Sequence, residues 1–262
     1  MSGARTYLSR VTDRELSDRL RASGAVLIEG PKACGKTETA RQQAGSFVLL
    51  DVDQAAQVAA GIDPALVLEG ATPRLVDEWQ VVPEIWNAVR RQVDERRRDG
   101  QFILTGSATP ADDITRHTGA GRITRLRMRT MTMHETGHSS GEVSLGGLLD
   151  GAFASCPDPG VVLADLIELV CRGGWPASLH RDLPDAQQAV RDYVEEIRRS
   201  DIHTVDGIHR DPGRVKAVLV ALARNVATEV SLATLAADAG MHLDSGIRPR
   251  KETVSEYLGS LE

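Results

Sequence analysis

The chain has 262 residues, which suits one large domain or a core domain with a smaller appendage. Hydrophobic residues make up 41% of it, but aromatic residues only 3%, so the buried core is expected to consist of Leu, Val, Ile and Ala. A net charge of −6 argues against a protein that coats nucleic acid over its whole surface, although a local basic patch is compatible with it.

Two further classes of protein are disfavoured by the sequence. Three cysteines, at positions 34, 156 and 171, have no C-x-x-C spacing, so neither a disulfide framework nor a cysteine-based zinc site is expected. The first ten residues, MSGARTYLSR, contain no apolar leader, and no apolar run approaches the roughly 18 residues of a membrane span. We therefore expect a soluble, cytoplasmic protein without a membrane partner.

The first element expected is a helix at 13–22, with Asp13 as candidate N-cap and Ser23-Gly24 at its end. An apolar strand at 25–29 follows and runs straight into the octet GPKACGKT, which fits G-x-x-x-x-G-K-[ST] at every fixed position. A helix from about 36 to 43 is expected after the octet.

The chemistry of this octet is specific for phosphate. Glycines let the backbone curl so that successive N–H groups point at phosphate oxygens. The lysine supplies positive charge to the β- and γ-phosphates, and the threonine hydroxyl can ligate Mg²⁺. The pattern predicts a nucleotide-binding loop made of Gly30, Pro31, Lys32, Ala33, Cys34, Gly35, Lys36 and Thr37.

A second informative stretch is PRLVDEWQ at 73–80, where a short apolar strand at 74–77 ends in two acidic residues. An acidic pair after a strand is the pattern of a Walker-B strand, although a solvated turn has the same composition. Following a phosphate-binding loop, the pattern assigns Asp77 to Mg²⁺ and Glu78 to the attacking water as a general base. Between loop and acidic strand we expect a strand at 47–51 and two short helices broken at 61–64.

After the acidic pair, a long helix is expected at 83–98, with Pro83 as its first residue. Its basic end, RRQVDERRR, is interpreted as a solvated face in preference to a nucleic-acid contact. A buried strand follows at 101–106, and an alternating strand at 122–128. Arg122, after two glycines, is a candidate charge-stabilising arginine or, equally, a surface residue.

Residues 134–138, His-Glu-Thr-Gly-His, match the zinc-peptidase signature H-E-x-x-H. That chemistry needs His134 and His138 on one helical face, with Glu135 beside the metal-bound water. Gly137 between the ligands weakens a helix, and no third ligand follows at an expected spacing. We therefore favour a loop or helix start over a zinc site.

From Leu145 the pattern changes to helices, expected at about 161–171, 184–200, 211–225, 231–239 and 249–258. The last two resemble a helix-turn-helix, in which Arg248, Arg250 and Lys251 could meet DNA phosphates, although such helix pairs also serve as packing modules. The expected domains are a P-loop core at 1–150, a helical region at 151–226 and a helix-turn-helix-like segment at 227–262.

With these pieces in order, the chain resembles the bacterial and archaeal ATP-binding proteins that join an AAA-type ATPase domain to a C-terminal domain of unknown function. The matching stretches are GPKACGKT, LVDEWQ with a proline after it, FILTGSA, GAGRITRLRMRTMTMHE and RGGWPA. The resemblance implies an α/β fold with a parallel sheet in the order 5-1-4-3-2, covered by helices. It also implies that Ser107 or Thr105, at a strand tip, senses the γ-phosphate.

The chain departs from this family in two places. The stretch TMTMHE replaces the usual Pro-Leu-Ser turn, which puts the H-E-x-x-H match inside a family turn. Family members usually continue past the helix-turn-helix, whereas this chain stops at Glu262, so we expect a short or truncated form.

Three functional hypotheses follow. The first is an ATP-Mg²⁺ protein that hydrolyses ATP as a conformational switch, with a homo-oligomer or protein partner. Lys36 and Glu78 then act in catalysis together with Ser107 and Arg122. The second is an ATP-responsive, DNA-associated regulator that uses residues 231–258. The third is a phosphotransferase, which shares the loop but needs an acceptor pocket that the sequence does not indicate. A zinc metallopeptidase that uses His134, Glu135 and His138 is a less favoured alternative.

Overall fold

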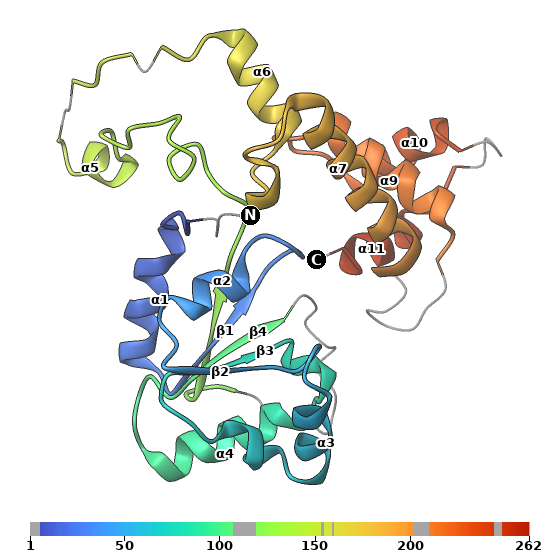
Figure 1. Cartoon of the computed structure of the whole chain (residues 1–262). Coiled ribbons are helices and arrows are strands. Elements are labelled where there is room, and N and C mark those ends of the chain that lie inside the picture. The colour runs from blue at the N-terminus through green and yellow to red at the C-terminus, as the bar shows by residue number, and fades with distance from the viewer. Residues whose placement is uncertain are drawn as a thin grey trace. The chain divides into compact units, whose positions relative to one another are not determined.

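The computed structural model describes residues 6–106, 119–152, 155–158, 160–201, 210–243 and 248–261. The chain divides into two compact units, Met1–Gln187 and Gln188–Glu262, which are described separately (Figure 1). The first unit holds a five-stranded sheet, and the second is helical.

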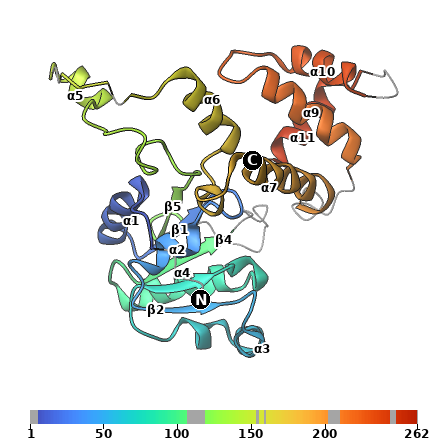
Figure 2. The same ribbon diagram turned by 45° about the horizontal axis from the view of Figure 1, so that its top comes forward.

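The sheet is parallel throughout and has the order β2-β3-β4-β1-β5. Its strands are β1 (Ala25–Glu29), β2 (Ser46–Leu49), β3 (Arg74–Asp77), β4 (Phe102–Gly106) and β5 (Ile123–Arg127). Figure 2 shows β5, β1 and β4 side by side. Read from β5, this is the order 5-1-4-3-2, so the predicted α/β fold class and strand order are confirmed.

The central strands β1, β3 and β4 are buried on both faces and are rich in apolar residues, whereas β5 alternates between buried and more exposed residues. In β1, Val26 and Ile28 pack with the helices α1 (Val11–Ala22) and α2 (Lys36–Arg41), whereas Ala25 and Leu27 pack with the opposite cluster. That second cluster contains the short helix η1 (Pro64–Leu68) and the helix α4 (Ile85–Arg96). Each fully buried Leu or Ile contributes roughly 1.5–3 kcal/mol through removal of its apolar surface from water.

The helix boundaries differ from the predicted ones for local reasons. Helix α1 begins at Val11, and Asp13 is its third residue, where its carboxylate accepts a hydrogen bond from the Arg10 backbone N–H at 2.7 Å. Asp13 therefore closes the first turn from inside the helix instead of capping it from outside. Helix α4 begins at Ile85, because Val82 and Pro83 form a turn whose carbonyls bind the first two helical N–H groups.

Other elements of the first unit were expected only in part. Helix α3 (Gln54–Ile62) and η1 form the predicted broken pair, but the short helices η2 (Trp79–Val81) and α5 (Leu145–Leu149) were not predicted. Helix α6 (Leu163–Arg172) and the turn η3 (Pro176–Ser178) lie within the predicted helical region.

The second unit is a three-helix cluster. Helix α7 (Leu183–Glu196) crosses the division between the units and continues as η4 (Ile197–Asp201). Helices α9 (Pro212–Arg224), α10 (Leu232–Met241) and α11 (Lys251–Gly259) pack around a shared apolar core. This confirms the predicted all-helical C-terminal region.

Candidate nucleotide-binding site

The phosphate-binding octet leaves β1 at Glu29 and enters α2 at Lys36. Three of its residues have positive φ: Gly30 at 155°, Ala33 at 60° and Gly35 at 104°. A Cβ on Gly30 would lie 2.2 Å from the Met128 carbonyl oxygen, closer than two atoms can approach. The first glycine is therefore required by the backbone of the strand beside it as well as by its own conformation.

Lys36 reaches back over the loop. Its ammonium donates hydrogen bonds to the carbonyl oxygens of Gly30, at 2.8 Å, and Pro31, at 3.0 Å. Burial lowers the pKa of Lys36 below its ordinary value, and the nearby acidic groups of Glu78 and Asp77 oppose this shift. A partly desolvated ammonium beside a glycine-rich loop is suited to binding phosphate oxygens.

Three hydroxyl and carboxylate groups from separate elements meet beside the loop. Thr37 of α2 donates to Oδ1 of Asp77, at the end of β3, at 2.8 Å. Thr105, fully buried in β4, donates to the same oxygen. The parallel register, which pairs Val76 with Leu104, brings Asp77 and Thr105 together.

This cluster has the donor set that Mg²⁺ prefers, since carboxylate and hydroxyl oxygens are hard ligands. Thr37 and Asp77, the two predicted metal ligands, share a hydrogen bond and are thus brought together. Thr105 is directed at the carboxylate, so its position suits a residue that orients Asp77.

Glu78 has a left-handed backbone, with φ 51° and ψ 46°. For a residue other than glycine this costs on the order of 1–3 kcal/mol and persists only where the surroundings impose it. Trp79 supplies such surroundings, because its fully buried ring lies 5.3 Å from the ring of Trp86. The Gln80 amide donates to the Glu78 carboxylate, which gives that side chain a defined direction.

Two predicted catalytic residues are not part of this cluster as described. Ser107 lies outside the described residues. Arg122 lies at the start of β5, where its carbonyl accepts from the Ala25 N–H and its guanidinium pairs with Asp94 at 2.8 Å. The octet is at the other end of β1, roughly 16 Å away at about 3.3 Å per residue, so within this chain Arg122 does not approach the phosphate loop.

Arg10, which the sequence analysis missed, lies directly behind the loop. Its buried guanidinium donates to the carbonyl oxygens of Cys34 and Arg129, each at 2.8 Å, and to Glu135 at 3.0 Å. No motif marks this arginine. The available signal was a single arginine just before a helix, which is too common to indicate a site.

The H-E-x-x-H match forms a turn instead of a helix, as its Gly137, with φ 80°, favours. Glu135 pairs with Arg10, and the His134 and His138 rings bond to the Ser139 carbonyl and the Thr136 hydroxyl. Within the described part of the chain, no group of three or more His, Cys, Asp or Glu residues is placed to hold a metal ion. The geometry does not support the zinc-peptidase hypothesis.

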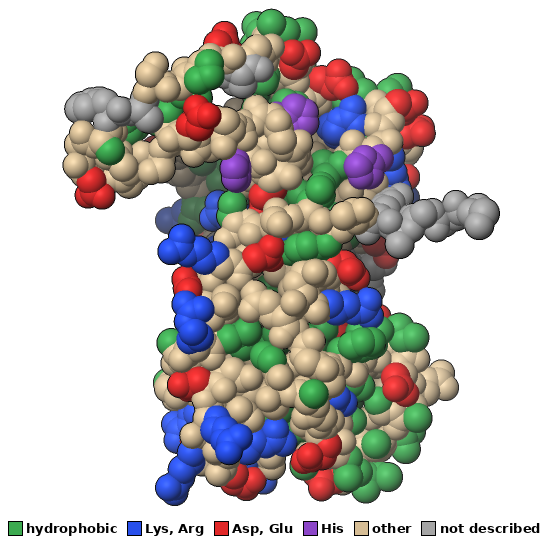
Figure 3. Space-filling model, turned by 60° about the vertical axis from the view of Figure 1, so that its left-hand side comes forward, with side chains coloured by type: hydrophobic (Ala, Val, Ile, Leu, Met, Phe, Trp, Pro, Cys, Tyr) green, Lys and Arg blue, Asp and Glu red, His purple; other side chains and the backbone are tan. Residues whose placement is uncertain are grey.

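Ion pairs link the charged end of α4 to other elements. Arg96 faces Glu69 at 3.4 Å, and Asp94 binds Arg122 at 2.8 Å. On the face of the molecule in Figure 3, blue Lys and Arg side chains are interspersed with red Asp and Glu side chains. This arrangement fits the preferred interpretation as a solvated, charged face.

The C-terminal helix pair is more widely separated than a helix-turn-helix. Residues 242–250 connect α10 to α11, whereas such motifs use a turn of about 3–4 residues. Arg248 donates to the Ala233 carbonyl of α10 at 2.6 Å, so its guanidinium already has a role in packing the two helices. The helix-turn-helix resemblance and DNA contact through this pair both stay predictions.

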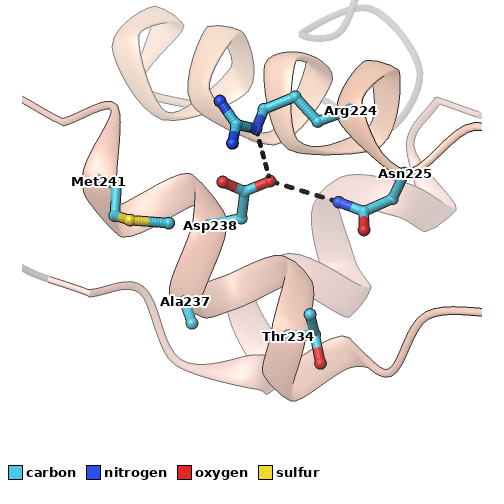
Figure 4. Close-up of a pocket in the computed structure, with 6 residues that line it drawn as sticks. All are labelled: Arg224, Asn225, Thr234, Ala237, Asp238 and Met241. Carbon is cyan, nitrogen blue, oxygen red and sulfur yellow. Dashed lines mark hydrogen bonds and ion pairs between the residues drawn. The ribbon is translucent and has the colours of Figure 1, made fainter.

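A pocket of about 270 Å³ lies between α9 and α10 (Figure 4). Asp238 projects into it and meets Arg224 at 3.4 Å and Asn225 at 3.3 Å. His242 lies 3.6 Å from the other carboxylate oxygen. Arg224 and Asn225 both face Oδ2, whereas Oδ1 accepts no hydrogen bond within the described part of the chain. One carboxylate oxygen does not indicate a ligand class.

None of the helices in the described ranges is both long enough and apolar enough to cross a membrane.

Two family models match separate parts of the chain. An AAA domain model matches residues 22–137, which include the octet, the acidic strand and the whole sheet. A domain of unknown function, DUF8612, matches residues 163–262.

Curated relatives add little about function. Uncharacterized protein Rv2008c of Mycobacterium tuberculosis and uncharacterized protein Mb2031c of Mycobacterium bovis are each 26% identical over 147 residues, or 53% of this chain. The match spans only 33% of the length of each relative.

The alignment with a solved structure of C. elegans PCH-2 covers 96% of this chain and 64% of that chain, at 12% sequence identity. Its TM-score of 0.26 is too low to support an argument. The family models and the sheet agree: this chain joins an AAA domain, which supports nucleotide binding, to a C-terminal domain of unknown function.

Proposed function

We propose that this protein binds ATP with Mg²⁺ at the octet and hydrolyses it as a conformational switch. The observation that carries the proposal is the convergence of the loop residue Thr37 with Asp77 beside Lys36. Strand β3 and the N-terminus of α2 supply these groups, and their chemistry matches the phosphate and the metal.

Each residue has a defined task in the proposed reaction. Lys36 exchanges the loop carbonyls for phosphate oxygens, and Thr37 and Asp77 hold Mg²⁺, which offsets the negative charge of the phosphates. Glu78, beside Asp77, accepts a proton from the attacking water. Ser107 remains a candidate γ-phosphate sensor by its place after β4 in the sequence.

The switch part of the proposal concerns what ATP does to the rest of the chain. The AAA domain match makes an oligomer or a protein partner a reasonable output of the switch. Size-exclusion chromatography with and without Mg²⁺-ATP tests this: a nucleotide-dependent change in apparent size supports it, and an unchanged elution with saturating ATP counts against an oligomeric output.

ATP turnover tests the hydrolytic part. We expect Mg²⁺-dependent phosphate release by the wild type, its loss with EDTA, and its loss in Lys36→Ala. Glu78→Gln is expected to retain nucleotide binding but to lose turnover by about 10²–10⁴-fold, the range for a general base. Undiminished turnover in Lys36→Ala would overturn the proposal.

A duplex-DNA binding assay tests the DNA-associated alternative. Duplex DNA that binds in a salt-dependent way and changes affinity with ATP would favour a regulator. Failure to bind duplex at low salt, with and without nucleotide, leaves the ATP switch as the function.

A further inference from the structure

The contacts of Arg10 indicate a role in the phosphate loop that no motif assigns. Its side chain is only 4% exposed, and that of Glu135, its ionic partner, 2%. A buried charge pair is stabilised when further hydrogen bonds meet it, and here the Nε, Nη1 and Nη2 atoms of Arg10 each donate one. Four backbone groups also meet this pair: the carbonyls of Cys34 and Arg129 and the N–H groups of Val11 and Thr132.

The most informative contact joins Arg10 Nη1 to the Cys34 carbonyl oxygen at 2.8 Å. The Cys34 carbonyl and the Gly35 N–H belong to one planar trans peptide unit, so they point in opposite directions. Because Arg10 binds this carbonyl, the Gly35 N–H points away from Arg10 and is left to face a phosphate, as the N–H groups of such a loop do.

The neighbourhood of Gly35 shows how closely Arg10 is fitted to the loop. Gly35 has φ 104°, and a Cβ at this position would lie 3.2 Å from Arg10 Nη1 and 3.7 Å from Pro176. A glycine at this position therefore admits both the left-handed backbone and the close guanidinium.

Glu135 fixes the guanidinium in this orientation. One carboxylate oxygen accepts from Arg10 Nε at 3.0 Å and from the Val11 N–H at 2.7 Å, and the other accepts from the Thr132 N–H at 2.6 Å. Arg10 Nη2 donates to the Arg129 carbonyl at 2.8 Å. Each of the three guanidinium nitrogens therefore has a hydrogen-bond partner.

We propose that Arg10, held by Glu135, is a positioning residue that sets the Gly35 peptide for phosphate binding. The proposal rests on the proposed ATP site and deepens it. In this proposal Glu135, the glutamate of the H-E-x-x-H match, holds Arg10 in place, and Arg10 in turn binds the nucleotide loop.

The test compares Mg²⁺-ATP affinity with the stability of the nucleotide-free protein. Arg10→Ala is expected to weaken ATP binding by about 10- to 100-fold, the range for losing one hydrogen bond to a charged group such as phosphate. Arg10→Lys keeps the charge but not the planar fork, so its affinity is expected to lie between those of Arg10→Ala and the wild type. Glu135→Gln is expected to weaken binding in the same direction.

Arg19→Ala is the matched control, because Arg19 lies on α1, the helix that Arg10 precedes. It pairs with Glu15, and its Nη1 donates to Thr124 of β5. Its nucleotide affinity is expected to equal that of the wild type. A purely structural role for Arg10 would lower the melting temperature of Arg10→Lys and leave its ATP affinity unchanged, and that result would overturn the proposal.

A nucleotide-free readout keeps this test separate from the ATP proposal. The amide resonance of Gly35 in ¹⁵N-labelled protein is expected to move in Arg10→Lys and to stay in Arg19→Ala. If the wild type binds no ATP, the proposed function fails, whereas a shifted Gly35 amide still supports positioning by Arg10. An unshifted Gly35 amide in Arg10→Lys contradicts the positioning role whether or not ATP binds.

Discussion

The octet at 30–37 and the pentapeptide at 134–138 both match a short motif at every fixed position, yet only one of them gathers the groups its chemistry needs. Around the octet, Thr37 meets Asp77 from a separate strand. In the pentapeptide, the two histidines bond to nearby groups of their own turn, and Glu135 is bound by Arg10. The difference teaches that a motif acquires function from the distant residues that meet it.

The largest expected effect is on the backbone of the octet. In Gly30→Ala, the new methyl group meets the Met128 carbonyl at 2.2 Å and the residue must keep φ 155°. Overpacking and a strained backbone each cost about 1–3 kcal/mol, so we expect unfolding free energy to fall by roughly 2–6 kcal/mol. Urea denaturation measures this.

The control for that change is Gly61→Ala in α3, where a Cβ meets nothing within 4 Å. Alanine is the better helix former, so this variant is expected to gain about 0.5–1 kcal/mol. Equal destabilisation in both variants would show that the octet has no special backbone requirement.

Thr105→Val sharpens the comparison at the metal cluster. It removes the buried hydroxyl that donates to Asp77, and losing a hydrogen bond to a charged group costs about 1.5–3 kcal/mol. We expect reduced stability and a higher Mg²⁺ concentration for half-maximal turnover. Thr12→Val is the matched control, since the buried Thr12 hydroxyl has no hydrogen-bond partner among the described residues, and it is expected to be neutral or stabilising.

The acid stability of the protein probes the pentapeptide's glutamate. Burial raises the pKa of Glu135, but the Thr132 and Val11 N–H groups and Arg10 outweigh this and bring the pKa below its ordinary 4.5. Its ionised form thus stabilises the folded state fully above pH 4.5, and this contribution is lost as pH falls through the lowered pKa. In Glu135→Gln, the unfolding free energy should decrease less steeply as the pH falls below 4.5 than it does in the wild type. An equal slope in both proteins would contradict an ionised Glu135 paired with Arg10.

The smallest effect is expected for His138→Ala. Its ring bonds to the Thr136 hydroxyl at 3.0 Å in an exposed turn, so the change in stability should stay within about ±0.5 kcal/mol. Metal analysis of wild type and variant accompanies the denaturation. Stoichiometric zinc that disappears in His138→Ala would restore the peptidase hypothesis and reverse the comparison.

Much of the nucleotide site could be predicted because its signals are local. The buried strands β1, β3 and β4 are short apolar runs that end in the octet, the acidic pair and a threonine. The strand order came from a family resemblance, since periodicity does not specify which strands pair.

Arg10 could not be predicted for a related reason. Its partners Cys34, Arg129 and Glu135 lie 24, 119 and 125 residues away, and two of the contacts are to backbone carbonyls, which every residue carries. The start of α1 was misplaced because Asp13 can bind a backbone N–H from either the N-cap or the third position.

Equilibrium binding of Mg²⁺-ATP to wild type and Lys36→Ala tests the central claim most directly. Lys251→Ala, which changes an exposed lysine of α11, serves as the control for removing one positive charge. We expect saturable, one-to-one binding to the wild type and to Lys251→Ala, and none to Lys36→Ala at the same concentrations. Equal affinity of all three proteins, or no binding by the wild type, would contradict the assignment of the octet as a nucleotide site.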